Sequence, residues 1–280
     1  MKNPDSVIYF QQDSERPEIF PFFQGTVGVF SSKKPTEERP NQDSCGIIQL
    51  DKDKSVLVVA DGLGGHRGGD TASKIAVEAI IKNTKKYEKN KNSLRELILE
   101  GFELANKQIR DLGVGAGTTL VVAEVNSKYV RFYSIGDSAA MLFGGKGVQK
   151  YKNVEQSLTG YAQNSTIIDE ETLMNHENRT MLFNALGDEN LRIEISSAIE
   201  MSSRDIILLA SDGLTDNFLS SKIADVITFG TVEERMQRLI DPAIKAMKGE
   251  DLFGHADDMT LVLYSLGRND PATLEEASER

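Results

Sequence analysis

The sequence contains no tryptophan and only one cysteine, Cys45. A single cysteine cannot form an internal disulfide, which fits a reducing compartment. No apolar run approaches the ~20 residues that a membrane-spanning helix needs. The first residues, Met-Lys-Asn-Pro-Asp-Ser, lack the apolar core of a secretory signal. We therefore expect a cytoplasmic protein with no membrane partner.

Positive charge is also scarce, because 32 Lys and Arg residues stand against 43 Asp and Glu residues, a net charge of −11. A surface of this sign repels phosphate backbones, so no nucleic-acid partner is expected. The length of 280 residues and the hydrophobic share of 39% suffice for a substantial core. They allow one large domain or two small ones.

The most informative stretch is residues 55–70, where an apolar run, Val56 to Ala60, ends abruptly at Asp61. Five glycines follow between positions 62 and 69. Glycine allows positive φ angles and a close approach of the backbone to a ligand. A carboxylate at the tip of a buried strand, on such a loop, suits a hard metal ion or a phosphate.

The same arrangement recurs along the chain. Asp212 follows the run 206–210, Asp137 follows the run 130–135, and Asp257 and Asp258 precede the run 259–264. If these strand ends converge, they form a cage of oxygen atoms with almost no nitrogen or sulfur. Such a cage is typical of Mg²⁺ or Mn²⁺ and not of Zn²⁺.

Other interpretations compete at individual positions. A single Asp-Gly pair such as Asp61-Gly62 more often forms a turn than a metal site. His66 is expected to pack in its loop, and Arg67 either neutralises the carboxylates or is solvated. Residues 51–56 begin like a calcium loop but lack its glycine, and residues 113–119 lack the lysine of a phosphate loop.

Hydrophobic periodicity predicts a strand-rich chain with paired helices instead of strict alternation, which indicates an α+β fold. Residues 1–24 have no assigned element, residues 31–40 are expected to form a loop, and Ser93 is the expected N-cap of the second helix. Predicted helices cover 70–87, 92–112, 220–228 and 232–247. Predicted strands cover 25–30, 46–50, 55–60, 118–123, 129–135, 139–143, 193–199, 205–210 and 259–266.

The segment 150–185 is polar and irregular, with one short helix expected at 169–175. A long segment of this kind inside a compact domain is often a binding loop or lid. The polar residues 268–280 are expected to form a disordered tail.

The motifs resemble those of the type 2C metal-dependent protein phosphatases in their bacterial form. The metal-binding loop of that family resembles Asp61-Gly-Leu-Gly-Gly-His66. Further resemblances occur in family order over residues 25–266, at Asn41-Gln-Asp43, Gly117-Thr-Thr119, Gly136-Asp-Ser138, Arg179 to Gly187, Ser211-Asp-Gly-Leu214 and Asp257-Asp-Met-Thr260. Each motif is weak alone, but their order and spacing together are specific.

The resemblance implies a single domain over residues 1–267 with a four-layer α-β-β-α sandwich, two antiparallel sheets flanked by helices. It implies two Mg²⁺ or Mn²⁺ ions per subunit, with a third ion in bacterial members. Asp61 would bridge two ions, the Gly62 carbonyl would bind one, and Asp212 and Asp257 would complete the second. Asp43 would act through a metal-bound water. The third ion would lie at Asp137 and Asp216.

Two metal ions about 3.5–4 Å apart can lower the pKa of a shared water so that hydroxide attacks phosphorus directly. No nucleophilic side chain or covalent intermediate is then required. The family grips phosphate with an arginine, for which Arg39 is the candidate, although it lies one residue closer to Asp43 than is usual. Leu63, Gln42, Ala139 and Asp258 are other departures from the family pattern.

The sequence therefore predicts a metal-dependent serine/threonine protein phosphatase, a hydrolase, that opposes a Ser/Thr kinase. Its partners would be phosphorylated proteins, and the resemblance favours a monomer. One alternative is a catalytically weak relative that binds a phosphoprotein, suggested by the spacing of Arg39 and the missing arginine after Ser138. A phosphatase for small phosphate esters is a second alternative.

Overall fold

A computed structural model describes residues 6–35, 37–63, 68–165, 172–173, 176–250 and 254–267. Two sheets face each other at its centre, and every strand pair in them is antiparallel. The first sheet has the order β1 (Ser6–Phe10), β4 (Ser44–Gln49), β5 (Lys54–Ala60), β6 (Leu120–Asn126), β7 (Tyr129–Ile135) and β10 (Glu194–Ile195), with β11 (Ile199–Glu200) also paired to β7. The second has the order β2 (Glu18–Phe22), β3 (Gly25–Ser32), β13 (Met259–Leu266), β12 (Ile206–Ala210), β8 (Ala139–Phe143) and β9 (Gln149–Lys152).

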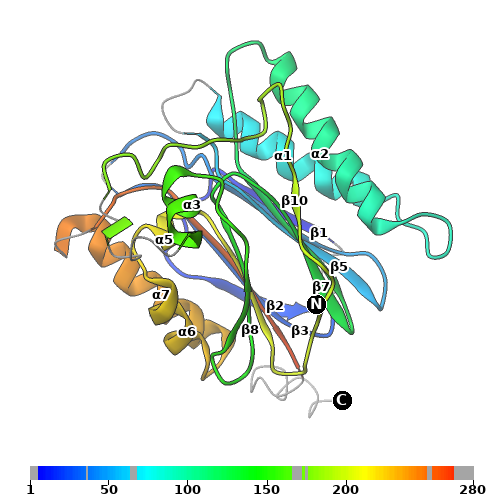
Figure 1. Ribbon diagram of the computed structural model, residues 1–280. Helices are drawn as coiled ribbons and strands as arrows, with labels where there is room; N and C mark the ends of the chain where they lie inside the picture. Colours follow the sequence, from blue (N-terminus) through cyan, green and yellow to red (C-terminus); the bar gives the residue numbers. More distant parts are fainter. Residues whose placement is uncertain are drawn as a thin grey trace.

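Helices cover the outer face of each sheet (Figure 1). The helices α1 (Gly69–Thr84) and α2 (Leu94–Asp111) pack on the first sheet. On the second sheet lie α6 (Ser220–Ile227) and α7 (Val232–Lys245), which continues into the π-helical turn η1 (Ala246–Glu250). The short helices α3 (Leu158–Asn164) and α5 (Asp212–Thr215) lie toward the same end of the sandwich. The predicted four-layer α+β sandwich is confirmed.

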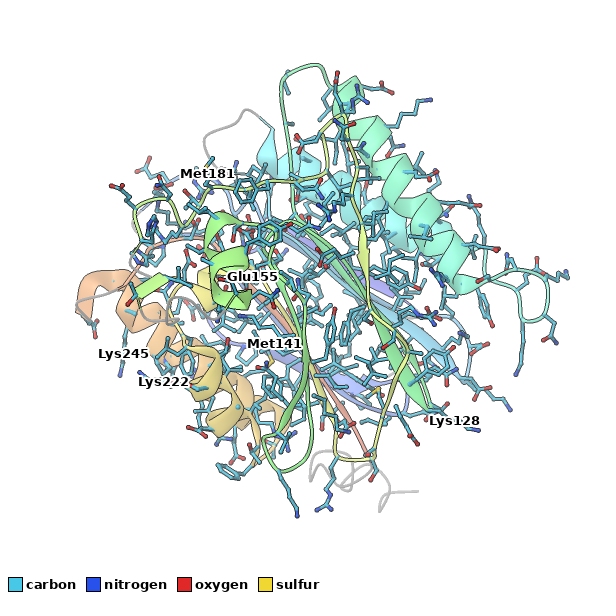
Figure 2. The ribbon with its side chains drawn as sticks, viewed as in Figure 1. Lys128, Met141, Glu155, Met181, Lys222 and Lys245 are labelled. Atoms are coloured by element: carbon cyan, nitrogen blue, oxygen red, sulfur yellow. The ribbon has the colours of Figure 1, made fainter. Side chains whose placement is uncertain are left out.

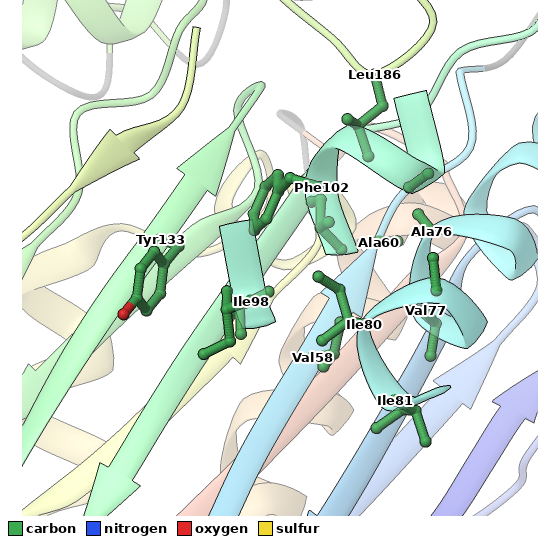
Figure 3. Close-up of a cluster of buried hydrophobic side chains, with 14 of the residues drawn as sticks. Val58, Ala60, Ala76, Val77, Ile80, Ile81, Ile98, Phe102, Tyr133 and Leu186 are labelled. Atoms are coloured by element: carbon green, nitrogen blue, oxygen red, sulfur yellow. The ribbon is translucent and has the colours of Figure 1, made fainter. Parts of the chain in front are cut away.

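The continuous apolar runs follow from this layering, because successive side chains of a strand point to opposite faces. In β5, Val56, Val58 and Ala60 face the helices α1 and α2, whereas Leu57 and Val59 face the second sheet. Figure 3 shows Val58 and Ala60 in one cluster with Ile80 of α1 and Phe102 of α2. A strand with two buried faces has no polar alternation, even in an antiparallel sheet.

Most predicted elements are present, and β7, β8 and β13 have the predicted bounds. Ser93 is the N-cap of α2, although its side chain makes no capping hydrogen bond. The strand predicted at 193–199 is instead two short strands, because the Ser196 hydroxyl accepts the hydrogen bond from the Phe132 backbone N–H at 2.9 Å.

Among the described residues, five elements were missed: β1 and β2 within residues 1–24, β9 and α3 at the start of the segment expected to be irregular, and the short helix α5 after β12. Most of the helix predicted at 169–175, and the tail 268–280, lie outside the described residues. No helix in the described part of the chain is long and apolar enough to cross a membrane.

Candidate metal centre

Antiparallel pairing brings the predicted aspartates to one end of the sandwich. Ser44 pairs with Ala60, so Asp43 before β4 lies beside Asp61 after β5. In the other sheet, Ala210 pairs with Leu261, so the residues just after β12 and just before β13 are neighbours. Asp212 and Asp257 occupy these two positions.

The strand ends enclose a cavity of about 470 Å³. Its walls hold carboxylates from both sheets and a segment of residues 180–188. The lining residues are Asp61, Gly62, Leu63, Thr119, Asp137, Thr180, Leu182, Asn184, Ala185, Asp188, Asp212 and Asp257. Five of the predicted site residues therefore face one space.

The loop that carries Asp61 is fixed by the start of β6. The Asp61 carbonyl accepts hydrogen bonds from the Thr119 N–H at 2.8 Å and from the Thr118 hydroxyl at 2.7 Å. The Asp61 N–H donates to the Thr119 hydroxyl at 3.0 Å. A Cβ atom on Gly62 would lie 2.3 Å from the Gly69 carbonyl oxygen, so only glycine allows α1 to begin this close to the loop.

Asp43 is buried and held by a serine from the opposite sheet. The Ser211 hydroxyl donates to Asp43 Oδ2 at 2.7 Å and accepts from the Thr260 N–H at 2.9 Å. Asp43 Oδ1 is buried with no hydrogen-bond partner among the described residues. An unpartnered buried carboxylate oxygen is costly and requires an explanation.

The carboxylates raise one another's pKa values. Burial raises the pKa of Asp61 well above its ordinary value, and the charges of Asp212, Asp43 and Asp257 raise it further. Burial also raises the pKa of Asp212 well above its ordinary value, again helped by Asp257. Burial brings the pKa of Asp43 to about 8, with a contribution from Asp258. A shared cation would remove this repulsion.

The donor set fits a hard divalent cation. Its charged members are carboxylates, and the orphaned Oδ1 of Asp43 offers a free oxygen lone pair beside them. Among the described residues, no three Asp, Glu, His or Cys side chains are already close enough together to hold a metal ion. The fit therefore rests on the donor chemistry and on the unpartnered oxygen.

The family model described as Protein phosphatase 2C matches residues 33–251. The chain belongs to this family. Membership confirms the predicted resemblance and the predicted activity class, a protein phosphatase, which is a hydrolase.

Individual relatives agree with the family match. The chain is 29% identical over 237 residues to the serine/threonine phosphatase stp of Listeria welshimeri, with 80% of this chain and 89% of that protein covered. Its fold is similar to that of serine/threonine phosphatase Stp1 from Staphylococcus aureus, with a TM-score of 0.74, 22% identity, and coverage of 91% and 99%. It is also similar to the catalytic domain of the phosphatase PstP in complex with two manganese ions, with a TM-score of 0.69, 22% identity, and coverage of 86% and 97%.

In this protein phosphatase 2C member, Asp137 lines the cavity and belongs to a second acidic group with Asp216 and Glu155. Burial raises the pKa of Asp137 to about 8, and the charges of Glu155 and Asp216 raise it further. Burial raises the pKa of Asp216 to about 7, although Arg179, whose Nε donates to Asp216 Oδ2 at 3.0 Å, lowers it. Figure 2 shows Glu155 next to α3.

Arg39 of the phosphatase lies at the edge of the acidic group. Its Nη2 is 3.7 Å from Asp257 Oδ1, its Nη1 donates to Asp258 Oδ2 at 2.6 Å, and its Nε donates to Glu37 Oε2 at 2.6 Å. The irregular spacing in the sequence therefore still places the guanidinium beside a predicted metal ligand.

The sequence did not single out two acidic residues of this site, Glu155 and Asp188. They approach the predicted ligands only through tertiary packing, and neither follows an apolar run as Asp61 and Asp212 do. Thr119 and Ser211 belong to motifs named from the sequence, but their hydrogen bonds to Asp61 and Asp43 emerge only in the structure. His66 and Arg67, in contrast, were considered from the sequence but lie outside the described residues.

Proposed function

We propose that this protein phosphatase hydrolyses phosphoserine and phosphothreonine in proteins with the help of two divalent cations, Mg²⁺ or Mn²⁺. The observation that carries the proposal is the cavity in which Asp61, Asp212 and Asp257 meet from both sheets. The family match and the serine/threonine phosphatases among its relatives support the substrate class.

Different side chains would bind the different metal ions. Asp61, Asp212, Asp257 and the Gly62 carbonyl would hold the two ions, and Asp43 would act on them through water. Asp137 and Asp216 would hold a third ion. The bound cations would supply Lewis acidity, which activates water near neutral pH and neutralises phosphoryl oxygens.

The protein itself positions the substrate. Arg39 would bind phosphoryl oxygens, since a guanidinium can donate two parallel hydrogen bonds to a phosphate. The Thr119 hydroxyl in the cavity wall is occupied by the Asp61 N–H and by the Ser138 hydroxyl at 2.6 Å. These contacts fix it as a support for the loop, which agrees with direct attack by water.

The activity class of the family also suggests the substrates and the enzyme that supplies them. Phosphorylated proteins would be the substrates, and a Ser/Thr kinase would supply them. We place the enzyme in the cytoplasm, since its only cysteine, Cys45, is a free and buried thiol. The family resemblance favours a monomer. Segment 150–185 contributes Thr180, Leu182 and Asn184 to the cavity wall and would contact the substrate chain.

A peptide panel tests the substrate class. Matched peptides with phosphoserine, phosphothreonine or phosphotyrosine would be incubated with the protein and Mn²⁺, and released phosphate would be measured. We expect turnover of the first two. Binding of the phosphopeptides without phosphate release would favour the non-catalytic alternative, and turnover of small esters alone would contradict a protein substrate.

A further inference from the structure

Asp257 and Asp258 are consecutive, but their side chains point to different parts of the structure. Asp257 lines the cavity, whereas Asp258 is 4% exposed and turns toward the loop of residues 34–42. Neighbouring residues at the start of a strand point to opposite sides, which explains the separation. The second aspartate is therefore not simply an additional charge in the cavity.

Three donors from this one loop converge on the Asp258 carboxylate. Its Oδ1 accepts from the Lys34 N–H at 2.7 Å, and its Oδ2 accepts from the Gln42 N–H at 2.8 Å and from Arg39 Nη1 at 2.6 Å. Both carboxylate oxygens of Asp258 therefore accept hydrogen bonds from the loop. The two backbone bonds fix the loop, and the third bond fixes the Arg39 side chain.

The position of Arg39 needs such a restraint. The side chain is 30% exposed, and it lies beside Asp257 at the edge of a strongly acidic cavity. Its other anionic partner, Glu37, is 38% exposed, so without Asp258 the guanidinium could swing onto the cavity carboxylates or out into solvent. Asp258 supplies an anionic partner outside the cavity, at hydrogen-bond distance and largely desolvated, where charge-assisted bonds are strong.

We infer that Asp258 is a positioning residue, which holds Arg39 at the cavity edge so that its remaining donors can bind the substrate phosphate. This inference rests on the proposed function, because it assigns Arg39 to the phosphate. Asp258 itself contacts neither the substrate nor the cations. It acts through Arg39 and the loop that carries it.

The test is a double-mutant cycle with Asp258→Asn, Arg39→Ala and the double variant. In each protein, saturated with Mn²⁺, the dissociation constant of inorganic phosphate would be measured by calorimetry, and KM and kcat would be measured with an aryl phosphate. The change to asparagine keeps the shape of the side chain but removes the charge that pairs with Arg39. The cycle isolates the coupling between the two residues.

We expect Asp258→Asn to weaken phosphate binding and raise KM by about tenfold or more, the factor that a hydrogen bond to a charged group contributes. The value of kcat should change less. In the Arg39→Ala background, Asp258→Asn should have almost no further effect. Asp258→Asn with unchanged phosphate affinity, or with an equal loss in both backgrounds, would overturn the inference.

Asp205→Asn is the matched control. Asp205 is also buried, accepts the Ser202 N–H at 2.9 Å and pairs with Lys150 at 2.6 Å, but it lies at the opposite end of β12. This variant should lower the melting temperature and leave phosphate affinity unchanged.

If Asp258→Asn does not fold, Arg39→Lys and Arg39→Gln test whether Arg39 binds the phosphate at all, which the inference requires. Both should lose phosphate affinity, because lysine keeps the charge without the planar fork of donors. Wild-type affinity in Arg39→Gln would overturn the inference. A wild-type protein without turnover would contradict the proposed function alone, since the calorimetric cycle still tests the positioning.

Discussion

The hydroxyl of Ser211 donates to Asp43 Oδ2 at 2.7 Å and so joins the end of one sheet to the end of the other. Asp43 Oδ1 is buried and has no hydrogen-bond partner in the part of the chain that the structure describes. Ser211 thereby orients a residue that, in our proposal, acts on the metal site through water.

Replacement of Ser211 by alanine tests this orientation. Residues that orient metal-site groups typically affect metal affinity or activity by 10–100-fold, so we expect a loss of about tenfold in Mn²⁺ affinity. Calorimetric titration with Mn²⁺ measures it. Unchanged affinity in a folded Ser211→Ala protein would show that Asp43 needs no such restraint.

Charge repulsion predicts that the metal-free site is a source of instability. Asp61→Asn should raise the melting temperature of the metal-free protein, because burial and neighbouring carboxylates disfavour the charged form of Asp61. The wild type should gain about 2.7 kcal/mol when Mn²⁺ is present at 100 times its dissociation constant. The Asp61→Asn variant should gain much less stability from the same relative concentration of Mn²⁺.

Asp225→Asn on the exposed face of α6 is the control for this comparison. It should leave both the metal-free melting temperature and the Mn²⁺ response unchanged. A flat melting temperature for the wild type across the titration would contradict the clustering of charges.

The raised pKa values also predict a pH dependence. In the metal-free folded state, Asp43 and Asp137 have pKa values of about 8 and Asp216 has one of about 7, all above the ordinary value near 3.9 of the unfolded chain. The folded state binds more protons over this interval, so unfolding free energy falls as pH rises from about 4 to about 8.

Thermal unfolding between pH 5 and pH 9, with EDTA, measures this slope. Saturating Mn²⁺ should flatten or reverse it, since cations favour the ionised carboxylates. A metal-free stability that increases steadily up to pH 8 would contradict the pKa shifts.

Gly62 offers a backbone test of the same site. An added Cβ would lie 2.3 Å from the Gly69 carbonyl oxygen and 2.6 Å from the Gln42 carbonyl oxygen, so the loop or α1 must move. Overpacking of this kind costs about 1–3 kcal/mol. Gly62→Ala should therefore lose activity and stability in a thermal melt.

Gly144→Ala is the comparison for this variant. The nearest atom to its Cβ would be the flexible end of Lys150 at 3.3 Å. It should retain wild-type activity. Wild-type activity in Gly62→Ala as well would show that the metal-binding loop does not need the close approach of α1.

The sequence predicted the central strands because their two buried faces make them continuous apolar runs, as in β12 and β13. The sequence did not predict three strands at the edges of the sheets. The strands β1, β2 and β9 each border a sheet and are at most half-buried along most of their length. The strand β1 also depends on a partner far away in the chain, β4.

The same distinction applies to the site. Asp61 and Asp212 were identifiable because each ends an apolar run, and antiparallel pairing then fixed their neighbours. The direction of the Asp258 side chain and the approach of Glu155 to Asp137 depend on loop packing, which leaves no periodic signal in the sequence.

The most direct test of the central claim is hydrolysis of an aryl phosphate by the purified protein with Mn²⁺, with Mg²⁺ and with EDTA, beside Asp212→Asn and Asp225→Asn. The account predicts turnover that requires a divalent cation, falls by orders of magnitude in Asp212→Asn and is unchanged in Asp225→Asn. Full activity in EDTA, or in Asp212→Asn, would contradict a hydrolase that works through cations held by the clustered aspartates.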